Sequence, residues 1–396
     1  MSKNICLLFF LFHAYLSSSY TDRICGQDLS NLWLDVVAVV DNSAGMTKGG
    51  LTSVAANIAS IFSKNTQIGT NPTSPKTTRL ALVTYNVDAT TAADLNKFQS
   101  IDDIYSGINS ALATISSSEE SYLARGLSQA EKVFQAGKHG FNRAHYQKVV
   151  IVYASTYKGS GDLNPVPVAQ RLKTSGVTII TVAYDQNKDG DILVDLEKIA
   201  TPYHNLSNEN LNVIGEIQGF LLQANCFCPT SWIQYRALHD DVDSYRYGIC
   251  ILPVGLTAVW RAAQLSCRNR WRNSYLLNEY DNRKHNFVIS SVKNFSGFHF
   301  PLSYHIGLNK VNGMWQWDQP QDWTQPQLQN YEIWNSGYPI SDSSLTTVLN
   351  RQTTVDLEIG WQNVHQFAAA SNYVCETAAC DTNNYCSSGG DSISNH

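Results

Sequence analysis

The chain has 396 residues, of which 43% are hydrophobic and 15% are charged, a composition typical of packed globular protein. This length predicts two or three domains. The net charge of −5 gives no basic surface for a nucleic acid, which excludes nucleic-acid-binding proteins as a class.

Residues 1–19 have the pattern of a signal peptide. Lys3 supplies a positive charge, residues 5–16 form a short apolar run, and residues 17–19 are serines, small enough for a cleavage site. A membrane anchor needs a longer apolar run, and no later stretch approaches that length. We therefore expect a secreted, extracellular chain without a membrane span.

Residues 25–225 are predicted to form one domain in which strands alternate with helices. Strands are expected at residues 34–40, 79–85, 148–154 and 177–183, and helices at residues 51–62, 122–137, 165–174 and 213–223. This alternation predicts an α/β fold, a doubly wound and mostly parallel sheet covered on both faces. Ligands of such sheets bind at the carboxyl ends of the strands.

The residues after the first strand carry a motif. The run at residues 41–45, DNSAG, resembles the D-x-S-x-S of von Willebrand factor A domains, which holds magnesium with a Thr and an Asp from later loops. Asp41 and Ser43 match this motif, Ser121 falls near the Thr position, and Gly45 replaces the last Ser. The resemblance therefore implies a metal site at Asp41, Ser43 and Ser121.

That metal site is expected to be degenerate. The sequence Tyr153-Ala154-Ser155 stands where the family has Thr-Asp-Gly, so the second carboxylate is missing. Magnesium prefers octahedral oxygen geometry and usually a carboxylate or two, so we expect weak binding or none. The alternative is a strand-end turn in which Asp41 accepts backbone hydrogen bonds.

A second acidic run resembles the start of an EF-hand loop. Asp185, Asn187 and Asp189 have the spacing of calcium ligands, but Leu196 stands where a bidentate Glu is required. The expected strand at residues 177–183 also leaves no room for the preceding helix. We interpret this run as a polar turn.

Nine cysteines are present, and Cys6 lies in the predicted signal peptide, so eight remain. Eight cysteines can pair in many ways, and the sequence alone leaves the pairing open. A zinc site at Cys226 and Cys228 is an alternative, but it lacks the usual C-x₂₋₄-C spacing and nearby histidines.

Residues 226–378 carry a series of motifs in a fixed order. The motifs are WxxAxxxC at 260–267, IGL at 306–308, WQWD at 315–318, WNSGYP at 334–339, WQN at 361–363 and YVCE at 373–376. Their order and spacing resemble the C-type lectin domain, which implies an α+β fold and carbohydrate binding. The family's matching proline follows a cis bond, so Pro339 is expected to do the same.

The resemblance also indicates where the ligand site lies, but this chain lacks the family's calcium ligands at those positions. Tyr338 and Ile340 stand where the family has Glu and Asn, and Gln362 and Asn363 stand where it has Asn and Asp. Calcium prefers several oxygen ligands including carboxylates. We therefore expect Tyr338, Ile340, Gln362 and Asn363 to bind a ligand without calcium, and we expect no cofactor.

The lectin pattern narrows the disulfides to Cys267–Cys375 and Cys228–Cys250. The remainder is Cys25 with Cys226, at the two ends of the first domain, and Cys380 with Cys386 in the tail. Apart from this small cysteine loop, residues 379–396 are expected to form a flexible tail. Glycosylation sequons occur at Asn205 and Asn294.

Catalytic motifs are absent from the sequence, which has no H-E-x-x-H, G-x-S-x-G or P-loop. His239 beside three aspartates, Asp240, Asp241 and Asp243, is interpreted as a solvated loop. We therefore expect no enzyme.

The domain pair resembles secreted nematode proteins that are regarded as immune-type recognition proteins. One hypothesis is a secreted recognition protein of innate immune defence that binds glycans. Its candidates for stacking on sugars are Trp315, Trp317, Trp323, Tyr331 and Tyr338. The other is a calcium-independent protein–protein adhesion or scaffold module whose partners are extracellular proteins.

Overall fold

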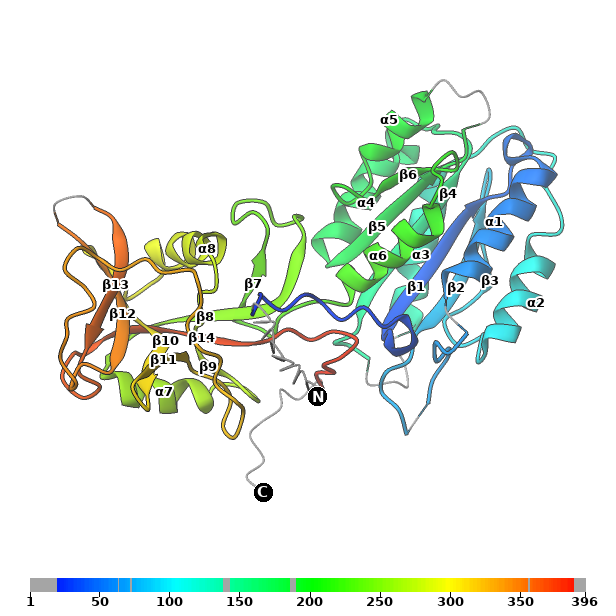
Figure 1. Cartoon of the computed structure of the whole chain (residues 1–396). Coiled ribbons are helices and arrows are strands. Elements are labelled where there is room, and N and C mark those ends of the chain that lie inside the picture. Colours follow the sequence, from blue (N-terminus) through cyan, green and yellow to red (C-terminus); the bar gives the residue numbers. More distant parts are fainter. Residues whose placement is uncertain are drawn as a thin grey trace, which may run out of the picture.

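The computed structural model describes residues 20–62, 64–71, 73–137, 143–185, 190–354 and 357–387. The expected signal peptide lies outside these residues. Two domains lie side by side, the first on the right of Figure 1 and the second on the left. Among the described residues, no helix combines the length and apolar character that a membrane crossing requires.

The first domain is built on a six-stranded sheet with the order β3-β2-β1-β4-β5-β6. The strands are β1 (Leu34–Asp41), β2 (Arg79–Tyr85), β3 (Ala89–Ala93), β4 (Gln147–Ala154), β5 (Val177–Ala183) and β6 (Asn205–Ser207). All neighbours pair in parallel except β2 and β3. The four predicted strands are confirmed, whereas the two edge strands were not predicted.

Helices cover both faces of this sheet. One core contains Val36, Ala38 and Val40 from β1, with α1 (Lys48–Ile61), α2 (Ile101–Ala111) and α6 (Val213–Ala224). The other contains Val37 and Val39, with α3 (Leu123–Ala136), α4 (Pro165–Thr174) and α5 (Asp191–Glu197). Because successive side chains of β1 point to opposite faces, an uninterrupted apolar run is what a doubly covered central strand requires. Short 3₁₀ turns lie at Leu29–Asn31, Ala44–Met46 and Gly161–Leu163.

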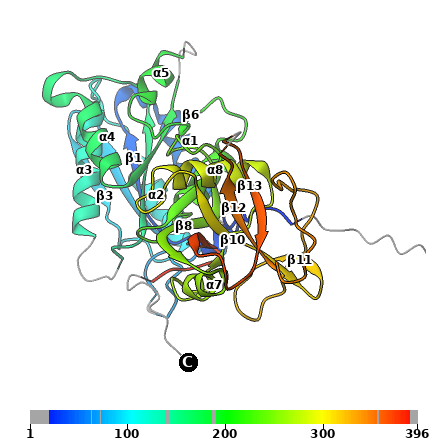
Figure 2. The ribbon, with the colours of Figure 1, turned by 90° about the vertical axis from the view of Figure 1, so that its left-hand side faces the viewer.

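The second domain has a curved sheet with the order β13-β12-β10-β14-β8-β7, to which β9 and β11 add short pairs. Its strands are β7 (Ile233–Arg236), β8 (Arg246–Ala258), β9 (Tyr275–Leu276), β10 (Ser303–Val311), β11 (Met314–Trp317), β12 (Thr347–Gln352), β13 (Ile359–Val364) and β14 (Ser371–Ala378). Two helices, α7 (Trp260–Arg268) and α8 (Asn282–Lys293), pack on it. The view in Figure 2 shows them beside the strands.

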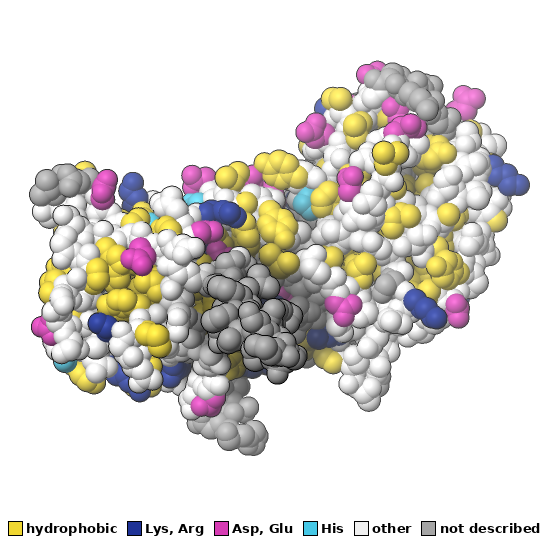
Figure 3. All heavy atoms as spheres, viewed as in Figure 1, with side chains coloured by type: hydrophobic (Ala, Val, Ile, Leu, Met, Phe, Trp, Pro, Cys, Tyr) yellow, Lys and Arg dark blue, Asp and Glu magenta, His cyan; other side chains and the backbone are white. Residues whose placement is uncertain are grey.

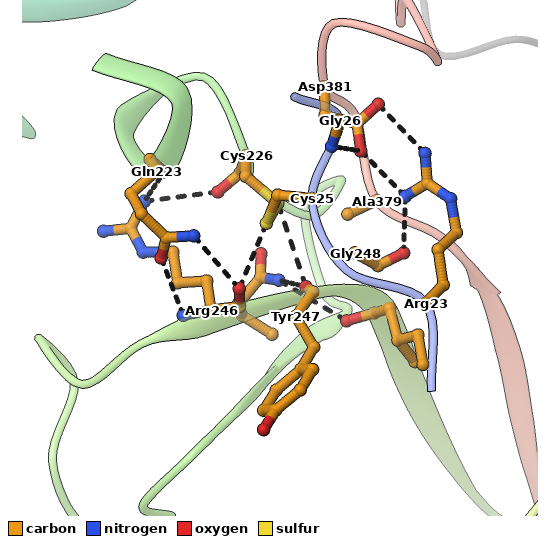
Figure 4. Close-up of a disulfide and its surroundings, with 12 residues drawn as sticks. Arg23, Cys25, Gly26, Gln223, Cys226, Arg246, Tyr247, Gly248, Ala379 and Asp381 are labelled. Carbon is orange, nitrogen blue, oxygen red and sulfur yellow. Dashed lines mark hydrogen bonds and ion pairs between the residues drawn. A yellow bond between two sulfur atoms is a disulfide. The ribbon is translucent and has the colours of Figure 1, made fainter. Parts of the chain in front are cut away.

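Four disulfides are present: Cys25–Cys226, Cys228–Cys250, Cys267–Cys375 and Cys380–Cys386. These are the pairs that the lectin resemblance and the remaining cysteines imply. Cys267–Cys375 joins α7 to β14 in the second domain. Cys25–Cys226 closes the first domain at the junction (Figure 4).

The segment before the first domain belongs to the second domain. Ile24 pairs with Tyr247 of β8 in an antiparallel bridge, and Gly248 donates its backbone N–H to the carbonyl of Arg23 at 2.7 Å. From residue 23 onward, the chain thus contacts the second domain, then forms the first, and returns to the second.

Residues 379–387 differ from the flexible tail that was expected, because they are packed at the junction. The Asp381 carboxylate is fully buried and accepts hydrogen bonds from Arg23 and from the backbone N–H of Gly26 (Figure 4). Tyr385 packs on Trp33 of the first domain at 4.9 Å between ring centroids. The small cysteine loop therefore joins the two domains.

Candidate functional site

The strand-end site of the first domain is built around Asp41, the last residue of β1. Its carboxylate is fully buried and accepts a 2.9 Å hydrogen bond from the backbone N–H of Ser43 and a 2.6 Å bond from the Ser155 hydroxyl. Ser121 lies in the loop before α3 and is also fully buried. The structure therefore places Asp41, Ser43 and Ser121 at the same edge of the sheet.

Three hydroxyls are buried in this region: that of Ser43 has no hydrogen-bond partner among the described residues, and those of Ser121 and Tyr85 interact with each other. Burial, together with the Asp41 carboxylate, raises the pKa of Tyr85 well above its ordinary value. Tyr85 thus remains a neutral phenol beside the carboxylate. Sequence reasoning missed it, although it pairs with Asp41 in register across β1 and β2.

The donor set at this edge fits a magnesium ion poorly. It offers one carboxylate and neutral hydroxyls, and the Ser155 hydroxyl already occupies one Asp41 oxygen. The described residues contain no group of three or more His, Cys, Asp or Glu side chains arranged to hold a metal. A hard divalent cation needs charged oxygens to offset its dehydration. This geometry is that of a strand-end turn.

The EF-hand-like run is described only in part, because Asn187 and Asp189 lie outside the described residues. Asp185 accepts a 2.9 Å hydrogen bond from the backbone N–H of Gly190, as in a turn. Leu196 is fully buried in the core beneath α5.

The candidate ligand face of the second domain is the loop that follows Trp334. The Tyr338–Pro339 peptide bond is cis, as the resemblance implies. The Asn363 side chain holds this loop: its oxygen accepts the backbone N–H of Ile340 at 2.8 Å, and its nitrogen donates to the Ile340 carbonyl at 2.9 Å. Both ends of the amide are therefore used inside the protein, and Asn363 is buried.

The four predicted ligand residues separate into two groups. Tyr338 is half-buried and Ile340 is 46% exposed, so both are at the surface. Gln362 and Asn363 are buried, and they lie on opposite faces of β13 because strand side chains alternate. The exposed Phe367 lies in the loop after β13 and was not predicted.

The aromatic residues considered for sugar stacking also differ in how deeply they are buried. Trp317 is buried, Trp315 packs on Trp334 at 5.4 Å, and Tyr331 packs on Trp361 at 5.7 Å between ring centroids. Trp323 is 60% exposed. Of the predicted group, Trp323 is thus exposed, Trp317 is buried, and Trp315, Tyr331 and Tyr338 are half-buried.

A buried polar network supports β12 and β13 beneath this face. The Glu279 carboxylate is fully buried and accepts hydrogen bonds from Trp361 (3.0 Å), Asn350 (2.9 Å) and His285 (3.0 Å). Burial opposes its charge, but His285 and these hydrogen bonds outweigh burial and lower the pKa of Glu279. Sequence reasoning did not find this network, whose members are far apart in the chain.

The two glycosylation sequons have different surroundings. Asn294 is exposed at the end of α8. Asn205 lies in β6, where its side-chain nitrogen donates to the Leu193 carbonyl at 2.7 Å and its oxygen accepts from Thr181 at 2.6 Å. A glycan on Asn205 would require breaking the bond to Leu193.

The histidine–aspartate cluster resembles no catalytic arrangement. His239 contacts Asp240 at 2.8 Å, and that aspartate side chain is fully exposed. Asp241 accepts a hydrogen bond from Tyr203 of the first domain instead.

Comparisons with known proteins agree with this architecture. The von Willebrand factor type A domain family matches residues 35–220, and the Lectin C-type domain family matches residues 257–377. The C-type lectin domain-containing protein 160 of Caenorhabditis elegans is 25% identical over 378 residues, which cover 91% of this chain. The chain spans only 56% of that relative's length.

Two solved structures are similar to parts of this chain. Proximal thread matrix protein 1 from the mussel byssus is 22% identical, with a TM-score of 0.42, over 51% of this chain and 49% of that one. Human lithostathine is 22% identical, with a TM-score of 0.30, over 38% of this chain and 99% of that one. Both family matches and the observed topology agree that, in this chain, a von Willebrand factor type A domain is followed by a C-type lectin domain.

Proposed function

We propose that this chain is a secreted, non-enzymatic recognition protein of innate immune defence, whose C-type lectin domain binds carbohydrate without calcium. Both domains belong to families of recognition and adhesion modules, which are generally non-catalytic. The proposal for the ligand rests on the lectin domain, because function is carried by a site and not by a fold.

The observation that supports binding without calcium is that the Asn363 side chain is engaged in hydrogen bonds inside the protein. Its two amide atoms hold the backbone of Ile340, so no free oxygen from this side chain faces a ligand. Tyr338 and Ile340 add no carboxylate. The loop is thus held by protein hydrogen bonds, and binding by this face relies on ring stacking and hydrogen bonds.

A second candidate is a protein–protein adhesion module without a sugar ligand. The observation that favours it is the exposure of apolar side chains in two loops of this domain, at Ile340 (46%) and at Phe367 after β13 (59%). Exposed aliphatic and aromatic side chains suit a protein contact, because such residues dominate the centres of protein interfaces.

A glycan array probed with the full secreted chain in calcium, and again in excess EDTA, tests the proposal. We expect the same bound glycans in both conditions. Tyr338→Ala should weaken binding about tenfold, or ~1.4 kcal/mol, while Tyr105→Ala in α2, where the tyrosine is 46% exposed, should leave it unchanged. Binding that is lost in EDTA and restored by calcium would show a working metal lectin, and an array without bound glycans would favour the adhesion module.

A further inference from the structure

A pocket lies between the two domains, separate from both sites described above. Its walls come from residues 201–204 and 220–224 of the first domain and from the hairpin at residues 237–246 of the second. Its volume is about 410 Å³. Small-molecule pockets have volumes of about 300–1,000 Å³ and are frequent at domain interfaces.

Hydrogen bonds join the two walls across the rim of the pocket. The Tyr203 hydroxyl of the first domain donates to the Asp241 carboxylate of the second at 2.7 Å. Around this bond, Tyr203, Leu238 and Tyr245 are 69%, 59% and 46% exposed. Figure 3 shows hydrophobic side chains gathered on this side of the junction. The rim is therefore apolar and is formed by both domains.

The inner wall presents a ring surface and a free acceptor. His204 lies over Phe220 at 4.2 Å between ring centroids, and its Nδ1 lies 2.7 Å from the Pro202 carbonyl. Because a carbonyl only accepts, Nδ1 carries the proton and Nε2 is left as an acceptor. Burial lowers the pKa of His204, which keeps the ring neutral.

Two acceptors of the wall, His204 Nε2 and the Asp243 carboxylate, have capacity to spare. One nitrogen of Arg246 donates to the carbonyls of Gln223 and Cys226, and the Gln223 amide donates to the Arg246 carbonyl. Among the described residues, no group donates a hydrogen bond to the Asp243 side chain. A ligand that carries a hydrogen-bond donor therefore finds an acceptor at Asp243 as well as at His204 Nε2.

The charges at the pocket select a neutral donor. Lys173, Arg236 and Arg246 all interact electrostatically with Asp243, but of these three cations only Arg246 lines the pocket, together with Asp241 and Asp243. A cationic ligand would meet Arg246, and an anionic ligand would meet the two carboxylates. An uncharged ligand with a hydrogen-bond donor avoids repulsion by charges of either sign.

We propose that this junction pocket binds a small, neutral aromatic molecule that carries a hydroxyl or N–H donor, such as a phenol or an indole. The ring lies against His204 and the apolar rim, and the donor reaches His204 Nε2 or Asp243. The site is independent of the loop after Trp334 and does not rest on carbohydrate binding.

Saturation-transfer NMR on the full chain, with indole and p-cresol as probes, tests this proposal. Benzoate and benzylamine serve as charged comparators. We expect transfer to the two neutral probes at millimolar concentration and at least fivefold less to either comparator. Leu238→Asp should abolish transfer, whereas Leu256→Asp, at a leucine that is 71% exposed and outside the pocket, should not. Hydrogen exchange should slow at residues 201–204 and 237–246 when indole is present.

Three results would overturn the proposal. The first is the absence of transfer to indole and p-cresol in the wild-type chain. The second is transfer that survives Leu238→Asp, which places the probes elsewhere. The third is equal or stronger transfer to benzoate or benzylamine, which contradicts the ligand class. Unchanged circular dichroism of both variants ensures that a loss reports the pocket and not unfolding.

Discussion

At the scale of single residues, the most consequential side chain is a buried lysine. The Lys284 ammonium is fully buried in α8 and lies 3.0 Å from Asp22 and 2.9 Å from Glu376. Burial alone would lower its pKa, but the two carboxylates raise the pKa of Lys284 above its ordinary value. Lys284 thus forms ion pairs with two buried carboxylates, Asp22 of the N-terminal segment and Glu376 of β14. The lectin domain depends on a residue that precedes the other domain in sequence.

Lys284→Met is expected to destabilise the second domain by about 3–5 kcal/mol, because it leaves two buried carboxylates without a cation. Asp22→Asn should lower the free energy of unfolding by less, because the ion pair between Lys284 and Glu376 remains. Chemical denaturation followed by tryptophan fluorescence measures this, since eight of the nine tryptophans follow residue 226. Lys293→Met, at an exposed position of the same helix, is the control and should be within about 0.5 kcal/mol of wild type.

The same variant has a predicted pH dependence. Burial raises the pKa of Glu376 even with Lys284 present, so without the lysine it rises further. A carboxyl whose folded pKa is raised destabilises the native state above that pKa, and the penalty disappears as falling pH protonates it. The loss in free energy of unfolding that Lys284→Met causes relative to wild type should therefore shrink as the pH falls from 7.5 to 5. A loss that stays constant or grows as the pH falls would contradict the role of Lys284 as the cation that neutralises Glu376.

At the scale of elements, the sequence predicts what is long, apolar and regularly spaced. The predicted strand at residues 79–85 coincides with β2, and the predicted helix at 165–174 coincides with α4, which begins with a proline after an Asn cap. The short edge strand β3 was missed because it is half exposed and reads ATTAA. Helix α5 was missed because its seven residues cover less than two turns of amphipathic pattern.

The candidate sites were likewise predictable only where regular spacing along the sequence places the residues. Motif spacing placed Asp41, Ser43 and Ser121 at one sheet edge, where Asp41 ends β1, Ser43 lies in the turn that follows it, and Ser121 lies in the loop before α3. It did not show that Ser155 donates to Asp41, or that Asn363 is used to hold a loop backbone. Those contacts depend on side-chain directions across strands, which a single sequence does not encode locally.

The strand-end site leads to a prediction about metal. Magnesium or manganese at low millimolar concentration should leave the melting temperature of the full chain nearly unchanged, because a ligand stabilises only if it binds the folded state. Ser155→Asp should be destabilised without metal, since it places a second carboxylate beside Asp41, and manganese should restore part of the loss. A clear rise for the wild-type chain that is lost in Asp41→Ala would show a functional metal site.

At the scale of the whole molecule, the first domain is held at both ends by segments of the second. The N-terminal segment pairs with β8, and Cys25 bonds to Cys226 at the start of the second domain. After β14, the chain returns to the junction, where the Trp33 indole donates to the Asp381 carbonyl at 3.0 Å. Lys76 of the first domain donates to the Thr382 carbonyl at 2.9 Å. Polar composition predicted a flexible tail, but these contacts use backbone atoms and one aromatic ring, which composition does not reveal.

This arrangement predicts that the cysteine loop fixes the angle between the domains. Removing residues 380–396 deletes the contacts of Asp381 and Tyr385 with Arg23, Gly26 and Trp33, and leaves Cys25–Cys226 as the disulfide at the junction. X-ray scattering should then show a larger maximum dimension and a radius of gyration that rises by about 2 Å or more, since domains with small interfaces move relative to each other. Removing residues 388–396 is the matched control, because it keeps the loop and should leave the scattering curve unchanged. Identical curves for the two truncations would mean that the disulfide and the N-terminal segment suffice to hold the domains, and the loop would then have no part in fixing their angle.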